Sequence, residues 1–237
     1  MSVHPTEKRI TIPQLSTMKG AGRIVMLTAY TKPMAQLLDP HCDVLLVGDS
    51  LAMVVYGMDN TMNLSLDTMI AHTQAVMRGS KHALVLLDMP FASYQESKEQ
   101  AYRNCARALA ESGAQALKLE GGAELVETVD YLVARGLPIM PHIGLMPQRV
   151  NQMGGFRSQG REEDAARKWT TIARGFESAG AFSILIEGTV EPVARAVVES
   201  VKVPVIGIGA SPACDGQVLV TEDILGLYPD LSPKFVK

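Results

Sequence analysis

Short apolar runs recur along the chain and are separated by longer amphipathic segments. The eight runs are Ile24–Thr28, Val44–Val47, Ala83–Leu87, Ala116–Leu119, Pro138–Pro141, Phe182–Ile186, Val203–Ile208 and Gln217–Val220. They are nearly continuous in apolar residues rather than alternating, which is typical of strands buried on both faces of a parallel sheet. The pattern therefore predicts eight parallel strands.

The segments between these strands carry the spacing of amphipathic helices. Ser97 and Gln100 form a capping box, in which the serine accepts from the backbone three residues on and the glutamine reaches back. Apolar stripes predict helices that end at Gly113, Gly136 and Gly180, because glycine adopts the left-handed conformation at low cost. The intervals between these glycines, 23 and 44 residues, suggest one and two strand–helix units.

Strands that alternate with helices indicate an α/β fold, and eight of them indicate a (β/α)8 TIM barrel in a single domain, residues 1–237. A doubly wound open sheet is the alternative. Extra helical turns are expected at Leu66–Met77 and before the first strand, within an N-terminal capping segment at about 1–22. The stretch at about 146–161 is too long and polar for a tight loop, and it predicts a flap over one end of the barrel.

Composition narrows the class of protein. Hydrophobic residues make up 47% of the 237, and the net charge of −3 argues against binding to nucleic acid. No apolar run approaches the ~18 residues that span a bilayer, and the N-terminus lacks a signal pattern. Cys42, Cys105 and Cys214 are far apart, which disfavours disulfides and structural zinc. We therefore expect a cytoplasmic enzyme without nucleic-acid or membrane partners.

Polar residues end or follow five of the apolar runs. They are Asp49 with Ser50, Asp88, Lys118 with Glu120, His142 and Glu187. The carboxyl ends of barrel strands meet on one rim, where barrel enzymes carry their catalytic groups. We therefore expect these side chains to converge although they are distant in sequence.

Each of these residues also has a purely structural interpretation. Asp49 or Asp88 could cap a following helix. Lys118 could form a buried ion pair with Glu120, which shares its face of the strand. His142 could be a core histidine held by hydrogen bonds. The occurrence of all of them at strand ends is what favours a functional site.

The carboxylates predict a metal site. Several carboxylates in a partly dry barrel mouth repel one another and tend to take up protons, and a divalent cation removes that conflict. Oxygen ligands without histidine pairs or cysteine clusters favour Mg²⁺ over zinc. Asp49, Asp88 and Glu120 come from three adjacent predicted strands, so one Mg²⁺ could contact all three. Glu187 lies two strands further round and is free to act as a base.

Several longer motifs occur in order along almost the whole chain. They include Val47-Gly48-Asp49-Ser50-Leu51, Leu87-Asp88-Met89-Pro90-Phe91, Lys118-Leu119-Glu120-Gly121-Gly122, His142-Ile143-Gly144-Leu145 and Asp215-Gly216-Gln217-Val218-Leu219-Val220. In this order they resemble the ketopantoate hydroxymethyltransferase family. The resemblance implies a (β/α)8 barrel, Mg²⁺, an α-keto acid substrate and 5,10-methylenetetrahydrofolate as the one-carbon donor. It also implies a homo-oligomer, commonly a decamer.

The resemblance further implies roles for single residues. It assigns Asp49, Asp88 and Glu120 to the metal, Asp49, Ser50, Asp88 and Lys118 to the keto acid, His142 to the site, and Glu187 to proton acceptance. The implied reaction transfers a hydroxymethyl group to 3-methyl-2-oxobutanoate and gives 2-dehydropantoate through a Mg-stabilised enolate. That reaction belongs to pantothenate and coenzyme A biosynthesis.

The chain departs from the family pattern at several places. Thr31 stands where the family usually has aspartate, Met146 where it has threonine, and Ser211-Pro212 where it has glycine. These departures affect rim contacts rather than the carboxylates. The chain also ends at Pro233-Lys234-Phe235-Val236-Lys237, where family members normally continue into a further helical segment.

Two other functions stay open. A lyase similar to phosphoenolpyruvate mutase or isocitrate lyase also pairs Mg²⁺ with an enolate in a barrel. Such enzymes usually carry a reactive cysteine in a mobile loop, and residues 146–161 contain none. A non-catalytic barrel that only binds a keto acid is the other alternative.

Overall fold

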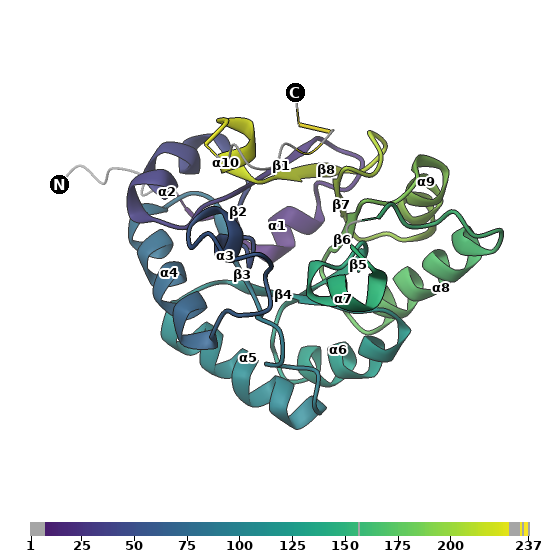
Figure 1. The fold of residues 1–237 in the computed structure, drawn as a ribbon, viewed down its shortest axis with the longest axis horizontal. Coiled ribbons are helices and arrows are strands. Elements are labelled where there is room, and N and C mark those ends of the chain that lie inside the picture. The colour runs from purple at the N-terminus through teal and green to yellow at the C-terminus, as the bar shows by residue number, and fades with distance from the viewer. Residues whose placement is uncertain (1–7, 156, 228–232, 234, 237) are drawn as a thin grey trace.

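Eight parallel strands close into a barrel in the computed structural model, which describes residues 8–155, 157–227, 233, 235 and 236 (Figure 1). The strands are β1 (Ile24–Thr28), β2 (Val44–Val47), β3 (Leu84–Asp88), β4 (Ala116–Glu120), β5 (Ile139–Gly144), β6 (Ile184–Glu187), β7 (Val205–Ile208) and β8 (Gly216–Leu219). Their order around the barrel is their order in sequence, and β8 pairs with β1. The predicted single-domain TIM barrel is confirmed, and the open sheet is excluded.

Helices surround the barrel. The longer ones are α2 (Lys32–Leu38), α4 (Leu66–Gly79), α5 (Lys98–Ser112), α6 (Val126–Val133), α8 (Ala165–Ser178) and α9 (Glu191–Ser200). The shorter ones are α1 (Ile12–Ser16), α3 (Leu51–Val54), α7 (Val150–Met153) and α10 (Thr221–Ile224), with 3-10 turns η1 (Asp39–His41), η2 (Ala123–Leu125) and η3 (Pro147–Arg149). No helix in the described ranges is long and apolar enough to cross a membrane.

The sequence signals for helix ends are confirmed. Ser97 Oγ accepts the Gln100 backbone N–H at 3.1 Å, and Gln100 Oε1 accepts from the residue just before the cap. Gly113, Gly136 and Gly180 have φ angles of 78°, 85° and 84°, which is the left-handed region that favours glycine. Each therefore ends its helix at low conformational cost.

The prediction of two strand–helix units between Gly136 and Gly180 is wrong. The stretch from Gly136 to Gly180 holds one strand and one long helix, β5 and α8, rather than two strand–helix units. The additional residues form the segment between them, which contains η3 and α7 and includes the predicted flap at 146–161. Residue 156 of that flap lies outside the described residues.

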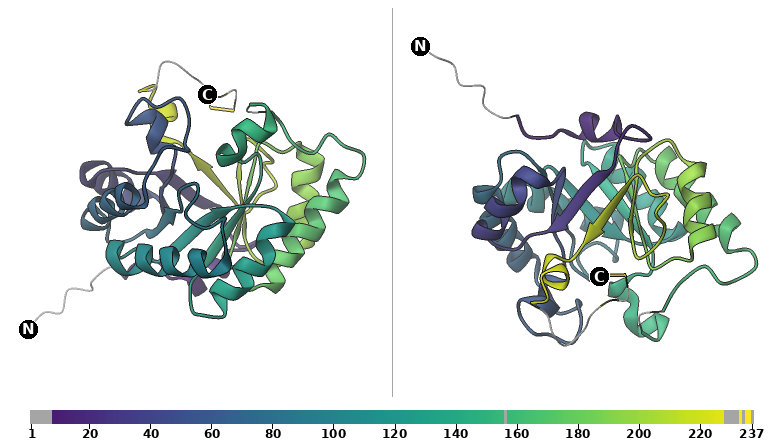
Figure 2. Two further views of the ribbon diagram at one scale, coloured as in Figure 1. Left: turned by 60° about the horizontal axis from the view of Figure 1, so that its bottom comes forward. Right: turned by 90° about the horizontal axis from the view of Figure 1, so that it is seen from above.

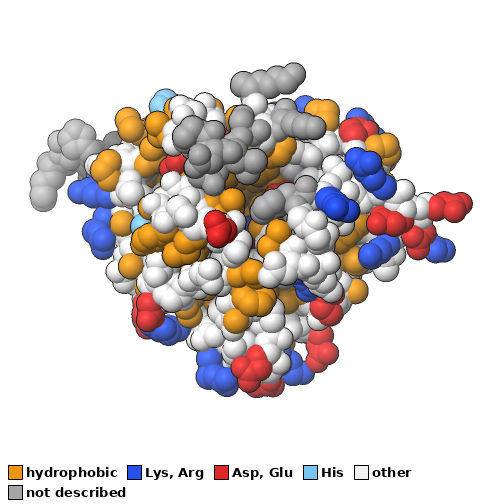
Figure 3. Space-filling view, viewed as in Figure 1, with side chains coloured by type: hydrophobic (Ala, Val, Ile, Leu, Met, Phe, Trp, Pro, Cys, Tyr) orange, Lys and Arg blue, Asp and Glu red, His pale blue; other side chains and the backbone are white. Residues whose placement is uncertain are grey.

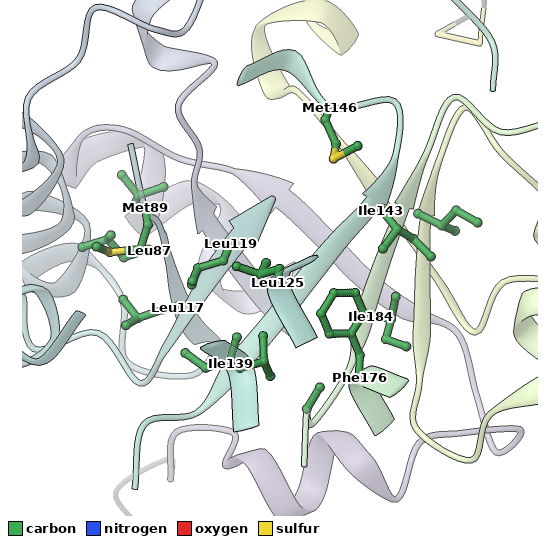
Figure 4. Close-up of a cluster of buried hydrophobic side chains, with 14 of the residues drawn as sticks. Leu87, Met89, Leu117, Leu119, Leu125, Ile139, Ile143, Met146, Phe176 and Ile184 are labelled. Carbon is green, nitrogen blue, oxygen red and sulfur yellow. The ribbon is translucent and has the colours of Figure 1, made fainter. Parts of the chain in front are cut away.

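Along each strand, side chains point alternately outward to the helices and inward to the barrel interior. Outward-facing residues of β3 to β6 pack with α6 and α8 and with η2, as Figure 4 shows for Leu87, Leu117, Ile139, Ile184 and Phe176. The interior residues near the amino ends form a second apolar cluster. Its strand members are Ile24, Met26, Val44, Leu46, Leu84, Leu86, Ala116, Met140, Leu185, Ile206 and Val218.

The amino end of the barrel is closed by α1. Leu15 of this helix is fully buried and belongs to the interior cluster. Figure 2 shows α1 at the end of the barrel opposite to α3, α7 and α10. Residues 1–7 of the expected capping segment lie outside the described residues. The carboxyl end is therefore the one available for a site.

Candidate active site

All the predicted site residues lie at the carboxyl ends of β2 to β6. Asp49 and Ser50 directly follow β2, Asp88 ends β3, Lys118 and Glu120 belong to β4, His142 belongs to β5, and Glu187 ends β6. The strand register pairs Lys118 with Asp88 and His142 with Glu120. The structure thus brings together residues from five consecutive strands.

Lys118 is the centre of a buried ion-pair network. Its Nζ lies 2.7 Å from Asp88 Oδ1 and 3.4 Å from Glu120 Oε1, and the residue is only 4% exposed. Burial alone would lower the pKa of this ammonium, but the surrounding carboxylates raise it above its ordinary value. The structural ion pair considered from sequence therefore exists, and it lies within the site as a permanent positive charge.

Asp49 and Asp88 carry an excess of negative charge. Burial and the charges of Asp88 and Glu120 raise the pKa of Asp49 well above its usual range. Burial also raises the pKa of Asp88, although Lys118 opposes that rise. Asp88 Oδ2 accepts the backbone N–H of Asp49 at 3.1 Å, which holds the ends of β2 and β3 together. This is a pair of neighbouring acids that a cation would stabilise.

His142 lies between two glutamates. Its Nδ1 is 3.3 Å from Glu120 Oε1, and its Nε2 is 3.4 Å from Glu187 Oε2. Neither buried ring nitrogen makes a hydrogen bond, so His142 is not a core histidine satisfied by its neighbours. These two nitrogens are available to a substrate or to a shared proton.

The two glutamates differ in acidity. Burial alone would raise the pKa of Glu120, but Lys118 and His142 lower it to about 2. Burial raises the pKa of Glu187 to about 7, with only a partial opposing effect of His142. A carboxylate with a pKa near neutrality is a stronger base than an ordinary one. Of the two glutamates, Glu187 is therefore the better candidate for taking up a proton from a substrate.

The donor set can be compared with the expected Mg²⁺ site. Over the described ranges, no three His, Cys, Asp or Glu side chains stand as a cluster that could hold a metal ion. Glu120 has both oxygens engaged, by Lys118 and His142 on one side and by the Gln148 backbone N–H on the other. Asp49 and Asp88 fit the chemistry best, because burial and mutual repulsion raise the pKa of the first and Mg²⁺ prefers carboxylate oxygens.

The sequence did not reveal the role of Gln148. This residue lies in η3, is 3% exposed, and donates from Nε2 to Asp49 Oδ2 at 3.0 Å. Its Oε1 accepts from the hydroxyl of Tyr94 at 2.7 Å. The available signal was a polar residue soon after β5, in a segment that was interpreted only as a flap.

The departures from the family pattern have local structural roles. Thr31 caps α2 by accepting the Met34 backbone N–H at 3.4 Å. Met146 is 6% exposed and packs in the apolar cluster between the strands and the surrounding helices. Ser211 Oγ donates to Glu191 Oε1 at 3.1 Å. These residues therefore serve capping and packing rather than the carboxylate network.

Charged and hydrophobic side chains occupy different parts of the surface around the site. In Figure 3, which views the carboxyl end, charged side chains gather mainly toward the margin and hydrophobic side chains nearer the middle. A closed parallel barrel with a buried lysine, a histidine and several carboxylates at this rim defines the molecule as a TIM-barrel enzyme.

Comparison with known proteins identifies the family. The family model described as ketopantoate hydroxymethyltransferase matches residues 9–237. The chain therefore belongs to the ketopantoate hydroxymethyltransferase family and is a one-carbon, hydroxymethyl transferase.

Curated relatives agree over the full length of the chain. The 3-methyl-2-oxobutanoate hydroxymethyltransferase of Sinorhizobium medicae is 58% identical, with 100% of this chain and 87% of that protein covered. The protein of the same name from Brucella canis is 59% identical and is covered over 86% of its length. From Pseudomonas aeruginosa, 3-methyl-2-oxobutanoate hydroxymethyltransferase 1 is 59% identical, with coverage of 100% and 87%.

Solved structures with the same fold come from other enzymes. A putative phosphonomutase from Burkholderia cenocepacia J2315 has a TM-score of 0.69 at 15% identity, covering 88% of this chain and 91% of that one. The 2,3-dimethylmalate lyase, a PEP mutase/isocitrate lyase superfamily member, has a TM-score of 0.66 at 18% identity, covering 92% and 83%. Such low identity shows a shared fold alone, so the transferase family, not the lyase alternative, describes this chain.

Proposed function

We propose that the protein is a 3-methyl-2-oxobutanoate hydroxymethyltransferase. It would transfer a hydroxymethyl group from 5,10-methylenetetrahydrofolate to 3-methyl-2-oxobutanoate, giving 2-dehydropantoate for pantothenate and coenzyme A biosynthesis. The observation that carries this proposal is the identity of 58–59% with relatives of that name over the whole chain. The site geometry supports it by supplying a base, positive charge and metal-type donors at one rim.

Asp49 and Asp88 would hold Mg²⁺, with Glu120 beside them. Bound there, the ion supplies a Lewis acid that polarises the keto oxygen of the substrate and makes its C3 proton more acidic. The protein contributes the negative charge, because burial raises the pKa values of both aspartates and so favours a nearby cation. Glu120, which has its oxygens engaged by the protein, positions Lys118 and His142.

Glu187 would act as the base. Its carboxylate takes the C3 proton, and the electron pair of the C–H bond passes into the enolate. Water would take the one-carbon unit off the folate as formaldehyde, breaking its two C–N bonds and leaving tetrahydrofolate. The enolate carbon would then attack formaldehyde, and the opened C=O bond would take up a proton to become the hydroxymethyl group. His142 Nε2 lies 3.4 Å from Glu187 Oε2, which is close enough for the two side chains to share the C3 proton. Burial supports this role because it raises the pKa of Glu187 to about 7.

Lys118 and Ser50 would contact the keto acid together with Asp49 and Asp88. The Lys118 ammonium supplies positive charge where the substrate oxygen becomes anionic. The Ser50 hydroxyl lies 2.7 Å from that of Tyr30, which fixes its direction at the barrel mouth. The segment 146–161 would cover the site and limit the entry of bulk water, since its base is anchored by Gln148.

The decisive experiment follows the C3 proton by NMR. The protein is mixed with 3-methyl-2-oxobutanoate and Mg²⁺ in D₂O, and the folate is added afterwards. The wild-type protein should exchange the proton and then form a hydroxymethyl product. Glu187→Gln should slow exchange by about 10²–10⁴-fold while Mg²⁺ binding persists. Exchange that survives this substitution would assign the base elsewhere, and wild-type binding without exchange would indicate a non-catalytic barrel.

The same base predicts a pH dependence. Because protonated Glu187 cannot accept the substrate proton, kcat/KM should fall about tenfold per pH unit below its pKa of about 7. Initial rates measured from pH 5 to pH 9 test this. A profile that is flat between pH 5 and pH 7 would contradict the assignment of Glu187.

The assembly is also a proposal. The family resemblance implies a homo-oligomer, commonly a decamer. Leu225 and Leu227, directly after α10, are 56% and 61% exposed, which supports contact with another subunit. Sedimentation velocity on the purified chain should show a species much larger than 25.6 kDa. A monomer at micromolar concentration would contradict the proposal.

A further inference from the structure

We propose that Gln148 is a positioning residue that holds the Asp49 and Glu120 carboxylates in register for the cation and keto acid. The inference rests on the proposed function, because it names the residue that prepares that site. Gln148 belongs to η3, near the start of the segment 146–161 that is proposed to cover the barrel mouth. It thereby connects this segment to two strands of the site.

The side-chain amide of Gln148 has a determined orientation. Its Nε2 donates to Asp49 Oδ2 at 3.0 Å and to the Met89 carbonyl at 2.9 Å. Its Oε1 accepts from the Tyr94 hydroxyl at 2.7 Å and from Gln95 Nε2 at 3.2 Å. Both amide hydrogens and both acceptor positions are used. A flipped amide would direct oxygen at a carboxylate, so only one orientation satisfies the network.

The backbone of Gln148 holds the second carboxylate. Its N–H donates to Glu120 Oε2 at 3.0 Å. The Tyr94 hydroxyl that fixes the Gln148 amide also accepts the Glu120 backbone N–H at 3.0 Å. Gln148 and Tyr94 are buried, at 3% and 2% exposure, so water does not compete for these bonds. One residue therefore fixes both Asp49, after β2, and Glu120, in β4.

The chemistry of an amide suits this position. A lysine here would neutralise Asp49 and weaken its attraction for a cation. A glutamate would repel both carboxylates. A neutral amide donates a hydrogen bond and leaves the negative charge of Asp49 available to a metal ion. Residues that orient metal ligands in this way are typically worth 10–100-fold in metal affinity or activity.

The test compares three variants of the full chain. Gln148→Met keeps the length of the side chain and removes all four amide bonds. Tyr94→Phe removes one hydroxyl and leaves the donors of Gln148 in place. Gln36→Met is the matched control, because it makes the same chemical change at an exposed position in α2, outside the segment that is proposed to cover the site. Mn²⁺ binding followed by electron paramagnetic resonance gives the metal affinity directly, without turnover.

We expect Gln148→Met to raise the Mn²⁺ Kd and the keto-acid KM by about tenfold or more, with part of the kcat recovered at saturating metal. Tyr94→Phe should shift both constants in the same direction by a smaller factor, and Gln36→Met should shift neither. If Gln148→Met fails to fold, Tyr94→Phe decides the question through the same two constants. A lowered melting temperature with unchanged Kd and KM would overturn the inference and leave Gln148 a purely structural residue. The wild-type protein separates this failure from that of the proposed function, which requires wild-type metal binding and C3 proton exchange.

Discussion

Asp39 and Asp49 lie near opposite ends of β2, and the protein holds their carboxyl groups in opposite ways. Asp39 accepts hydrogen bonds from Ser80 Oγ and from the backbone N–H groups of residues 81–83. Partial burial would raise the pKa of Asp39, but these four bonds lower it below its usual value. Burial and neighbouring acids raise the pKa of Asp49, which has a single side-chain donor, Gln148.

The difference extends through the whole barrel. At the amino end the interior of the barrel is apolar and is closed by α1. The nearby Asp39 carboxylate has both oxygens hydrogen-bonded. At the carboxyl end the same inward positions carry Asp88, Lys118 and Glu120. The amino half therefore stabilises the fold, while the carboxyl half holds charges that stability alone would not favour. Substitutions in the two halves should separate stability from turnover.

The largest effect is expected for Lys118→Met. The substitution leaves the buried Asp88 and Glu120 without their cation and should lower the free energy of unfolding by about 3–5 kcal/mol at pH 8. At pH 5 the loss should be smaller, because the freed carboxyls take up protons. Turnover should fall about 10²–10³-fold. Urea unfolding and initial rates measure both quantities.

Lys19→Met is the control for that substitution. Lys19 pairs with Asp215 at 2.9 Å near the amino end, and it is partly exposed. Its loss should reduce stability only slightly and leave turnover unchanged. Equal turnover losses in both variants would contradict the division of the barrel into two halves.

Leu86→Ala tests the apolar half. Leu86 is fully buried in the interior cluster, so the cavity should cost about 2–5 kcal/mol of unfolding free energy. The kcat of the remaining folded protein should not change, because no site residue loses a partner. Rates are measured well below the melting temperature and corrected for the folded fraction. A kcat that falls together with stability would show that the two halves are coupled.

Gly144→Ala should disturb Glu187 through the backbone. A Cβ at residue 144 would lie 2.3 Å from the Glu187 carbonyl oxygen, and φ is +90°. We expect a loss of about 1–3 kcal/mol in stability from overpacking and a larger proportional loss of turnover, because the base is displaced. Gly136→Ala is the control, since its φ is +85° and no atom lies within 4 Å. Equal turnover in the two variants would show that the contact does not matter.

The smallest effect is expected for Asp39→Asn. Replacing the carboxylate should cost about 1–2 kcal/mol at pH 7, because the amide cannot accept from all four donors. The folded-state pKa of Asp39 is depressed, so its stabilisation is present above the ordinary value of 3.8 and is lost as the pH falls through the folded pKa. The stability difference between the wild type and the variant should therefore shrink below about pH 4. A difference that is constant with pH would contradict this account.

The strands were predictable because their outward faces meet helices and their inward faces fill the barrel. The apolar runs nevertheless stopped short where the site begins. Asp88, Glu120 and His142 are strand residues in the structure, although the runs ended just before each of them. Hydrophobicity marks buried strands, and a polar residue that faces the interior ends the signal before it ends the strand.

The side chains of the site were predictable in position but not in all their contacts. Strand order alone brings Asp88 beside Lys118 and Glu120 beside His142. Gln148 and Tyr94 come from segments whose course no periodicity specifies, and their roles depend on tertiary hydrogen bonds. The sequence offered the Lys118–Glu120 ion pair only as a structural alternative, and nothing in it indicated that the Gln148 backbone also engages Glu120. Together these contacts make Glu120 the poorest of the three expected metal ligands.

The pairing of the last strand with the first has a consequence for folding during synthesis. β8 bonds to β1 on one side and to β7 on the other. The sheet cannot close until Leu219 has emerged from the ribosome, so β1 keeps one open edge until then, and whichever strand was made last keeps another. Open edges are templates for aggregation. Nascent chains should therefore need shielding by chaperones for most of their synthesis, and the finished barrel should need none.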